Sequence, residues 1–183
     1  DSYSGITANP ALGFASDLIV THGGSTILSE TPEIYGAEHL LIARAQNSDL
    51  IKKINNQIKW WKDYTSINGG SLDNNPSPGN KKGGLTTILE KSLGAVAKSG
   101  SSDMINVLDY SEPISLKGFN FINSPGYDPV SVTGQVASGA NIICFTTGRG
   151  SCFGFKPSPS IKIATNTNMY NKLIEDMDIN AGS

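Results

Sequence analysis

The chain has 183 residues, of which 38% are hydrophobic and 16% are charged, and its formal net charge is −2. This length and hydrophobic content suit one globular domain with a substantial core. The charge excludes the broad basic surface that recruits nucleic acid, so no nucleic-acid partner is expected. No apolar run approaches the roughly 18 residues that span a bilayer, and two cysteines make no disulfide framework, so we expect a cytoplasmic protein without a membrane segment.

In the first half of the chain, the spacing of apolar residues predicts mainly helices. The first helix starts near Pro10, with Asn9 as its cap, and ends at His22. A short strand is expected at residues 25–28, and further helices are expected at residues 36–46, 48–66 and 85–96.

The second half contains short β-branched or aromatic segments bounded by glycine, proline, asparagine or serine, which is typical of strands. Strands separated by helices imply parallel pairing and helices on both faces of a sheet. The sequence therefore predicts a three-layer, Rossmann-like α/β domain with a mostly parallel central sheet. The expected strands are residues 105–108, 119–122, 141–145 and 161–164, with helices from about Pro129 and at residues 167–176.

A first candidate site follows the predicted strand that contains Cys144, which we expect to be buried as a small apolar residue. Ligands of open α/β sheets bind beyond the carboxyl ends of strands. The segment TTGRGS supplies two hydroxyls and a guanidinium between glycines, from Thr146, Thr147 and Arg149. It is either a carboxylate clamp or a tight turn whose arginine points to solvent.

The loop NPSPGNKKGG precedes the predicted helix at Leu85 and is a second candidate. It is not a nucleotide-binding P-loop, because that motif needs a lysine after a glycine and directly before Ser or Thr, whereas these lysines precede the glycines. The amide groups at the helix start, together with Asn80, Lys81 and Lys82, are expected to bind an anion. The alternative is a solvated surface loop.

A third candidate combines two carboxylates with an imidazole, from Glu30, Glu33 and His39. These groups suit proton transfer or the binding of a hard metal ion. Alternatively, Glu30 caps the helix near Gly36 and His39 is a hydrogen-bonded residue at its edge. The aromatic residues Trp60, Trp61 and Tyr64 are expected in the core or in a subunit contact.

Six blocks of the sequence resemble the carboxyl-terminal domain of the altronate dehydratase and galactarate dehydratase family. The resemblance extends from Asp1 to Ser183, and the second block and the proline loop are more similar to altronate dehydratase. The blocks are DSYSGITANPALG, ILSETPEIYGAEHLL, DNNPSPGNKKGGLTTILEKSLGAVAKSG, SPGYDPVSVTGQVASGAN, CFTTGRGS and MDINAG.

The resemblance implies a hydro-lyase of sugar-acid catabolism that removes water from altronate to give 2-keto-3-deoxygluconate. It also implies a divalent metal, iron(II) or manganese(II), whose ligands stay unassigned, a homo-oligomer, and amino-terminal domains of the same parent chain. The sequence is therefore expected to be one domain, a fragment truncated at both ends. In the family, a Cys-Gly-Gly-Ser-type run precedes the first block. The alternatives are a galactarate dehydratase, a sulfolactate lyase, or a non-catalytic assembly domain whose partner domains carry the chemistry.

Dehydration of a 2,3-dihydroxy acid requires removal of a weakly acidic proton beside a carboxylate, stabilisation of the resulting enediolate and departure of hydroxide. Arg149 with the two threonines, or Lys81 and Lys82, are expected to hold the carboxylate. The carboxylates and the imidazole of the third candidate are expected to transfer protons or bind the metal.

Overall fold

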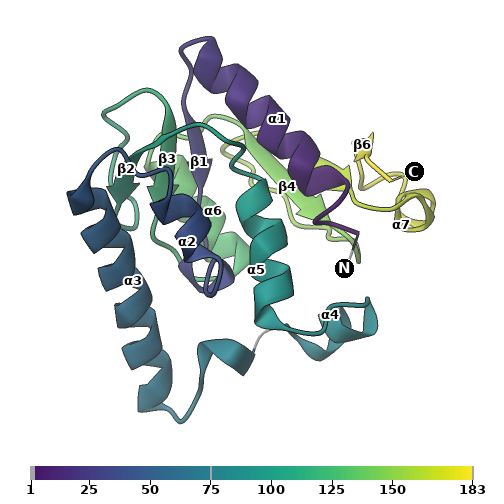
Figure 1. Ribbon diagram of the computed structural model, residues 1–183. Coiled ribbons are helices and arrows are strands. Elements are labelled where there is room, and N and C mark those ends of the chain that lie inside the picture. Colours follow the sequence, from purple (N-terminus) through teal and green to yellow (C-terminus); the bar gives the residue numbers. More distant parts are fainter. Residues whose placement is uncertain (1–2, 75, 183) are drawn as a thin grey trace.

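The computed structural model describes residues 3–74 and 76–182, whose strands form two parallel, three-stranded sheets (Figure 1). The first sheet has the order β1-β3-β2 and the second has the order β4-β5-β6. The Rossmann-like α/β class with parallel strands is thus confirmed, with the strands divided between two sheets instead of one. The strands are β1 (Thr26–Leu28), β2 (Met104–Leu108), β3 (Phe119–Ile122), β4 (Ile143–Thr147), β5 (Ser160–Ala164) and β6 (Ile179–Asn180).

The register of the first sheet aligns the carboxyl ends of its three strands. Leu28 of β1 and Val107 of β2 both pair with Phe121 of β3. The segments that follow these strands, beginning at residues 29, 109 and 123, therefore gather along one edge of the sheet, where ligands of parallel sheets bind.

Helices lie on both sides of the first sheet, with α2 and α3 in front of it and α6 behind it in the view of Figure 1. Helix α1 packs on α5 and reaches β4 of the second sheet. The α-helices are α1 (Ala8–Thr21), α2 (Glu38–Ile42), α3 (Ser48–Ile67), α4 (Pro78–Lys82), α5 (Ile88–Ala97), α6 (Asp128–Ala137) and α7 (Thr167–Lys172), and the 3-10 turns are η1 (Thr31–Glu33) and η2 (Leu72–Asn74).

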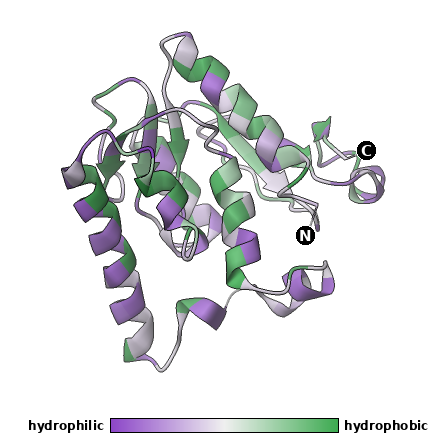
Figure 2. Ribbon diagram, in the orientation of Figure 1, coloured by the Kyte–Doolittle hydropathy of each residue, from purple (hydrophilic) through white to green (hydrophobic). Residues whose placement is uncertain are grey.

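The main core lies between the first sheet and α3. Phe119 and Phe121 are fully buried, and burial of each aromatic side chain stabilises the fold by about 1.5–3 kcal/mol. Helix α3 presents Leu50, Ile54 and Ile58 to this core, while its outer face is hydrophilic (Figure 2). None of the helices formed by the described residues is long and apolar enough to cross a membrane.

The start of α1 differs from its prediction. Thr7, not Asn9, precedes the helix, and the Asn9 side chain donates a hydrogen bond to Gly94 O (2.8 Å) of α5. The predicted end is confirmed, because His22 is the residue that ends α1 and its Nδ1 lies 2.8 Å from Leu18 O.

Two further boundaries also differ. The helix expected from Leu85 starts at Ile88, because the Thr87 side chain accepts the amide of Glu90 (3.2 Å) as an amino-terminal cap. The final helix ends at Lys172, and the chain then runs beside β5, where Lys162 N donates to the Asp178 carboxylate (2.7 Å).

Candidate functional site

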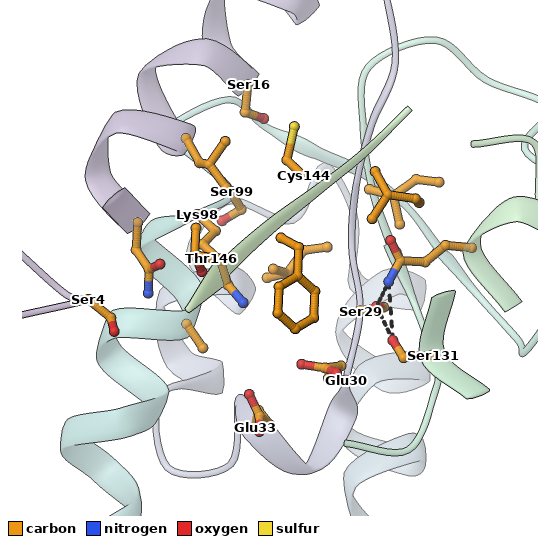
Figure 3. A pocket seen from close by; sticks show the side chains of 18 of the residues that line it. Ser4, Ser16, Ser29, Glu30, Glu33, Lys98, Ser99, Ser131, Cys144 and Thr146 are labelled. Atoms are coloured by element: carbon orange, nitrogen blue, oxygen red, sulfur yellow. Dashed lines mark hydrogen bonds between the residues drawn. The ribbon is translucent and has the colours of Figure 1, made fainter. Parts of the chain in front are cut away.

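A cavity of about 1350 Å³ lies where β1 of the first sheet faces β4 of the second (Figure 3). Its wall also includes residues of α1, α5 and α6. Six of the nine site residues predicted from the sequence line this cavity, although they come from three separate segments of the chain. These six are Glu30, Glu33, Asn80, Thr146, Thr147 and Arg149.

The turn after β1 presents Glu30 and Glu33 to the cavity, as Figure 3 shows. Glu30 has a left-handed backbone conformation with φ of 73°, which is uncommon for a residue other than glycine and costs on the order of 1 kcal/mol. Ser124, just after β3, holds this turn: its Oγ accepts the amide of Glu30 (3.0 Å) and its carbonyl accepts the amide of Thr31 (3.0 Å). The sheet edge therefore fixes the backbone of the turn that carries both glutamates.

Helix α5 supplies two lysines to the same carboxyl groups. Lys91 Nζ lies 2.6 Å from Glu33 Oε1, and both side chains are largely buried, at 19% and 17% exposure. Lys98 is seven residues further along, two helical turns away, and also lines the cavity. Asp128, in the first turn of α6, adds a third carboxylate. The cluster is thus nearly balanced in charge.

The environment displaces the pKa values of the two glutamates in opposite directions. Burial, followed by repulsion from Glu33, raises the pKa of Glu30 to about 8. Burial also opposes ionisation of Glu33, but the ammonium groups of Lys91 and Lys98 outweigh it and lower the pKa of Glu33. At neutral pH Glu30 is therefore protonated and Glu33 ionised. Burial and repulsion from Glu33 raise the pKa of Asp128 as well.

A small hydroxyl and amide network borders the carboxyl groups. Ser29 and Ser131 lie with their Oγ atoms 2.9 Å apart, and Gln135 Nε2 donates to both (2.6 and 3.1 Å; Figure 3). Ser29 and Ser131 are almost fully buried at the edge of the cavity. Such groups suit the hydroxyls of a polyhydroxylated ligand, because hydroxyls both donate and accept.

The turn after β4 brings Arg149 to the wall of the cavity. Thr147 Oγ1 accepts the amide of Gly150 (3.0 Å), so this hydroxyl also shapes the turn. The Arg149 guanidinium lies directly against Gly79 of α4, next to Asn80. The TTGRGS turn and the proline loop, remote in sequence, therefore meet at the cavity.

The structure places the remaining nominated residues elsewhere. Lys81 and Lys82 are exposed in the last turn of α4, instead of at the start of the following helix, and are not among the described residues that line the cavity. His39 is exposed in α2 and does not line it either. Cys144, expected to be buried, is exposed.

Sequence reasoning missed Lys91, Lys98 and Asp128. The seven-residue spacing of the lysines on one helix was a signal that they share a face. That signal was hidden because an amphipathic helix usually exposes its lysines to solvent.

The carboxyl groups of this cavity do not fit a divalent metal. Among residues 3–74 and 76–182, no group of three or more His, Cys, Asp or Glu side chains is arranged to hold a metal ion. Glu33 is already paired with Lys91, and burial raises the pKa of Glu30, which disfavours the ionised form that a metal ligand needs. A divalent cation here would also be repelled by the two ammonium groups.

Comparison with known proteins places these observations in a family. The model of the family "D-galactarate/Altronate dehydratase, C-terminal" matches residues 1–183. Galactarate dehydratase (L-threo-forming) of Escherichia coli is 44% identical over 183 residues, which are 100% of this chain and 35% of that protein. Altronate dehydratase of Bacillus subtilis is 44% identical over 182 residues, covering 100% of this chain and 36% of that protein.

A more distant relative is named for a different activity. The (2R)-sulfolactate sulfo-lyase subunit beta of Chromohalobacter salexigens is 33% identical over 182 residues, which cover 98% of this chain and 47% of that protein. The chain thus spans about a third of the length of the two dehydratases and about half of the sulfo-lyase subunit.

Proposed function

Because the chain belongs to the D-galactarate/altronate dehydratase family, we propose that its cavity binds a sugar acid and transfers the protons of a dehydration. The observation that carries the proposal is the pair Glu30 and Glu33, which share one cavity while their pKa values diverge. Such a pair supplies one proton donor and one proton acceptor at the same pH.

The two glutamates suit the two halves of the reaction. Glu33, ionised, accepts the proton from the carbon beside the substrate carboxylate, and the C–H electron pair forms the enediolate. Glu30, protonated, donates its proton to the hydroxyl that leaves the neighbouring carbon, so the C–O bond breaks and water departs. The resulting enol rearranges to the 2-keto-3-deoxy acid.

The interaction between the two carboxyl groups allows the site to return to its starting state. After one turnover Glu33 carries the proton and Glu30 is ionised. Because the two carboxyl groups interact directly, the proton returns to Glu30, whose pKa is the higher of the two. No other residue is required to restore the starting state.

Positive groups on the wall suit the substrate carboxylate and the enediolate. Lys98 acts on both glutamates, and a bound carboxylate would draw the lysines toward itself and make Glu33 more basic. Arg149 and Thr146 also line the cavity and offer donors, and an arginine binds a carboxylate with two parallel hydrogen bonds.

Altronate is the proposed substrate, because two blocks of the sequence resemble altronate dehydratase more than galactarate dehydratase. Galactarate and a sulfonated acid stand as alternatives, since relatives named for them match the same residues. We propose that iron(II) or manganese(II) binds outside this cavity, on the amino-terminal domains or between the subunits of a homo-oligomer.

Calorimetric titration of the chain with altronate tests this function. We expect saturable binding that weakens at least tenfold in Lys98→Met and is unchanged in Lys52→Met, a matched lysine exposed on α3 beside Asp49. Absence of saturable binding by the wild-type chain would instead support a non-catalytic assembly domain. If the Lys98→Met variant binds altronate as tightly as the wild type, Lys98 does not contribute to the proposed site.

A further inference from the structure

The backbone that carries Arg149 is fixed from two sides. Thr147 Oγ1 accepts the amide of Gly150 (3.0 Å), and Asn166 Nδ2 donates to the carbonyl of Gly148 (3.1 Å). The main chain is held before and after residue 149. The position of the guanidinium therefore depends on the surface that the long Arg149 side chain packs against.

That surface is the backbone of Gly79 in α4. A β-carbon placed on Gly79 would lie 2.7 Å from Arg149 Nη2 and closer still to Nη1 and Cζ, whereas real β-carbons essentially never come within 3.0 Å of another heavy atom. Gly79 does not have a positive φ, so its backbone would accept an L-residue. Glycine is therefore required at position 79 because a side chain would leave no space for the guanidinium, and not because of the backbone conformation.

We infer that Gly79 is a positioning residue that sets the plane of the Arg149 guanidinium at the wall of the cavity. The inference rests on the proposed function, in which Arg149 binds the substrate carboxylate. Bidentate binding requires the plane of the guanidinium to match the plane of the carboxylate, so a shift of the arginine by one methyl group lowers affinity. Any side chain at position 79 would displace the guanidinium from α4.

The main test is a double-mutant cycle with altronate as the probe. Gly79→Ala is expected to weaken altronate binding about tenfold, because the guanidinium moves, without lowering the thermal midpoint of unfolding, since the far end of a flexible side chain gives way. Gly154→Ala is the matched control: a β-carbon there meets no atom within 4 Å, and binding is expected to equal that of the wild type. In an Arg149→Ala background, Gly79→Ala is expected to have no further effect.

The outcomes separate this inference from the proposed function. If Arg149→Ala binds altronate as tightly as the wild type, the carboxylate-binding role of the arginine fails. If Arg149→Ala weakens binding while Gly79→Ala does not, only the inference fails. An equal loss from Gly79→Ala with and without Arg149 also overturns it, because the glycine would then act independently of the arginine.

A second measurement needs no ligand. The Nε–Hε signal of Arg149 in a nitrogen-15 NMR spectrum is expected to shift in Gly79→Ala and to stay in place in Gly154→Ala. An unchanged signal in Gly79→Ala would overturn the inference even if altronate did not bind.

Discussion

Glu30 and Glu33 lie three residues apart on the turn after β1, and their pKa values are displaced in opposite directions. The cause is position: both are buried, but Glu33 has a lysine 2.6 Å away and Glu30 has Glu33 as its neighbour. The surroundings at the sheet edge and on helix α5 thus make Glu30 a proton donor and Glu33 a proton acceptor at the same pH.

The stability of the fold should depend on pH through Glu30. Its folded pKa of about 8 exceeds the ordinary value of 4.5, so the folded protein keeps a proton that the unfolded chain releases between these pH values. The stability that this proton provides is complete below about pH 4.5 and is lost as the pH rises through about 8. Glu30→Gln cannot ionise, so its thermal midpoint relative to the wild type should rise from pH 5 to pH 9. A difference that stays constant with pH would contradict this.

Lys91→Met should raise the pKa of Glu33 and destabilise the fold. Removal of one partner of a buried ion pair costs about 3–5 kcal/mol, and we expect about 2 kcal/mol here because both side chains keep some exposure. Chemical denaturation measures the loss, and the double variant Lys91→Met/Glu33→Gln should recover most of it. Lys52→Met, in the exposed pair with Asp49, should change stability by less than about 0.5 kcal/mol.

Glu30→Gln should lower turnover of altronate in a full-length enzyme that contains this chain. Loss of a general acid typically reduces the rate by roughly 10²–10⁴-fold, while ground-state binding of the carboxylate should persist. Steady-state kinetics separates the two effects. His39→Gln should keep wild-type turnover, because His39 is exposed on α2; a large loss there with little loss in Glu30→Gln would reverse the assignment.

Asp17 should stabilise the fold by joining α1 to the loop before β2. Its carboxylate accepts hydrogen bonds from the amides of Ser101 and Ser102 (each 2.9 Å) and from both of their hydroxyls. Burial opposes ionisation, yet these hydrogen bonds lower the pKa of Asp17. Asp17→Ala should therefore cost about 1–3 kcal/mol in a denaturant titration near neutral pH, and Asp49→Ala, on an exposed side chain, should cost far less. Because the folded pKa is depressed, this contribution should be lost as the pH falls below about 3.8.

Periodicity and turn chemistry were sufficient to predict the α/β class and most elements. The strand Phe119–Ile122 and the start of α3 at Ser48 match the prediction, since an aromatic and β-branched segment and a helical stripe of apolar residues are local signals. The division into two sheets and strand β6 were missed. Both depend on which strands pair, which is a long-range property that no single segment carries.

The candidate site was predicted in part for a similar physical reason. Glu30 and Arg149 follow strands, and the rule that ligands bind at strand ends correctly brought them to one cavity. Lys91 and Lys98 sit on a helix, where a lysine normally faces solvent. Their inward direction is decided by the packing of α5 against η1, which only the structure reveals.

The most direct measurement is a carbon-13 NMR titration of the side-chain carboxyls of Glu30 and Glu33 in the wild-type chain. Glu30 should titrate near pH 8 and Glu33 below the usual glutamate range. Two ordinary titrations, both near pH 4.5, would show that the pair cannot serve as donor and acceptor at one pH and would contradict the proposed proton transfer.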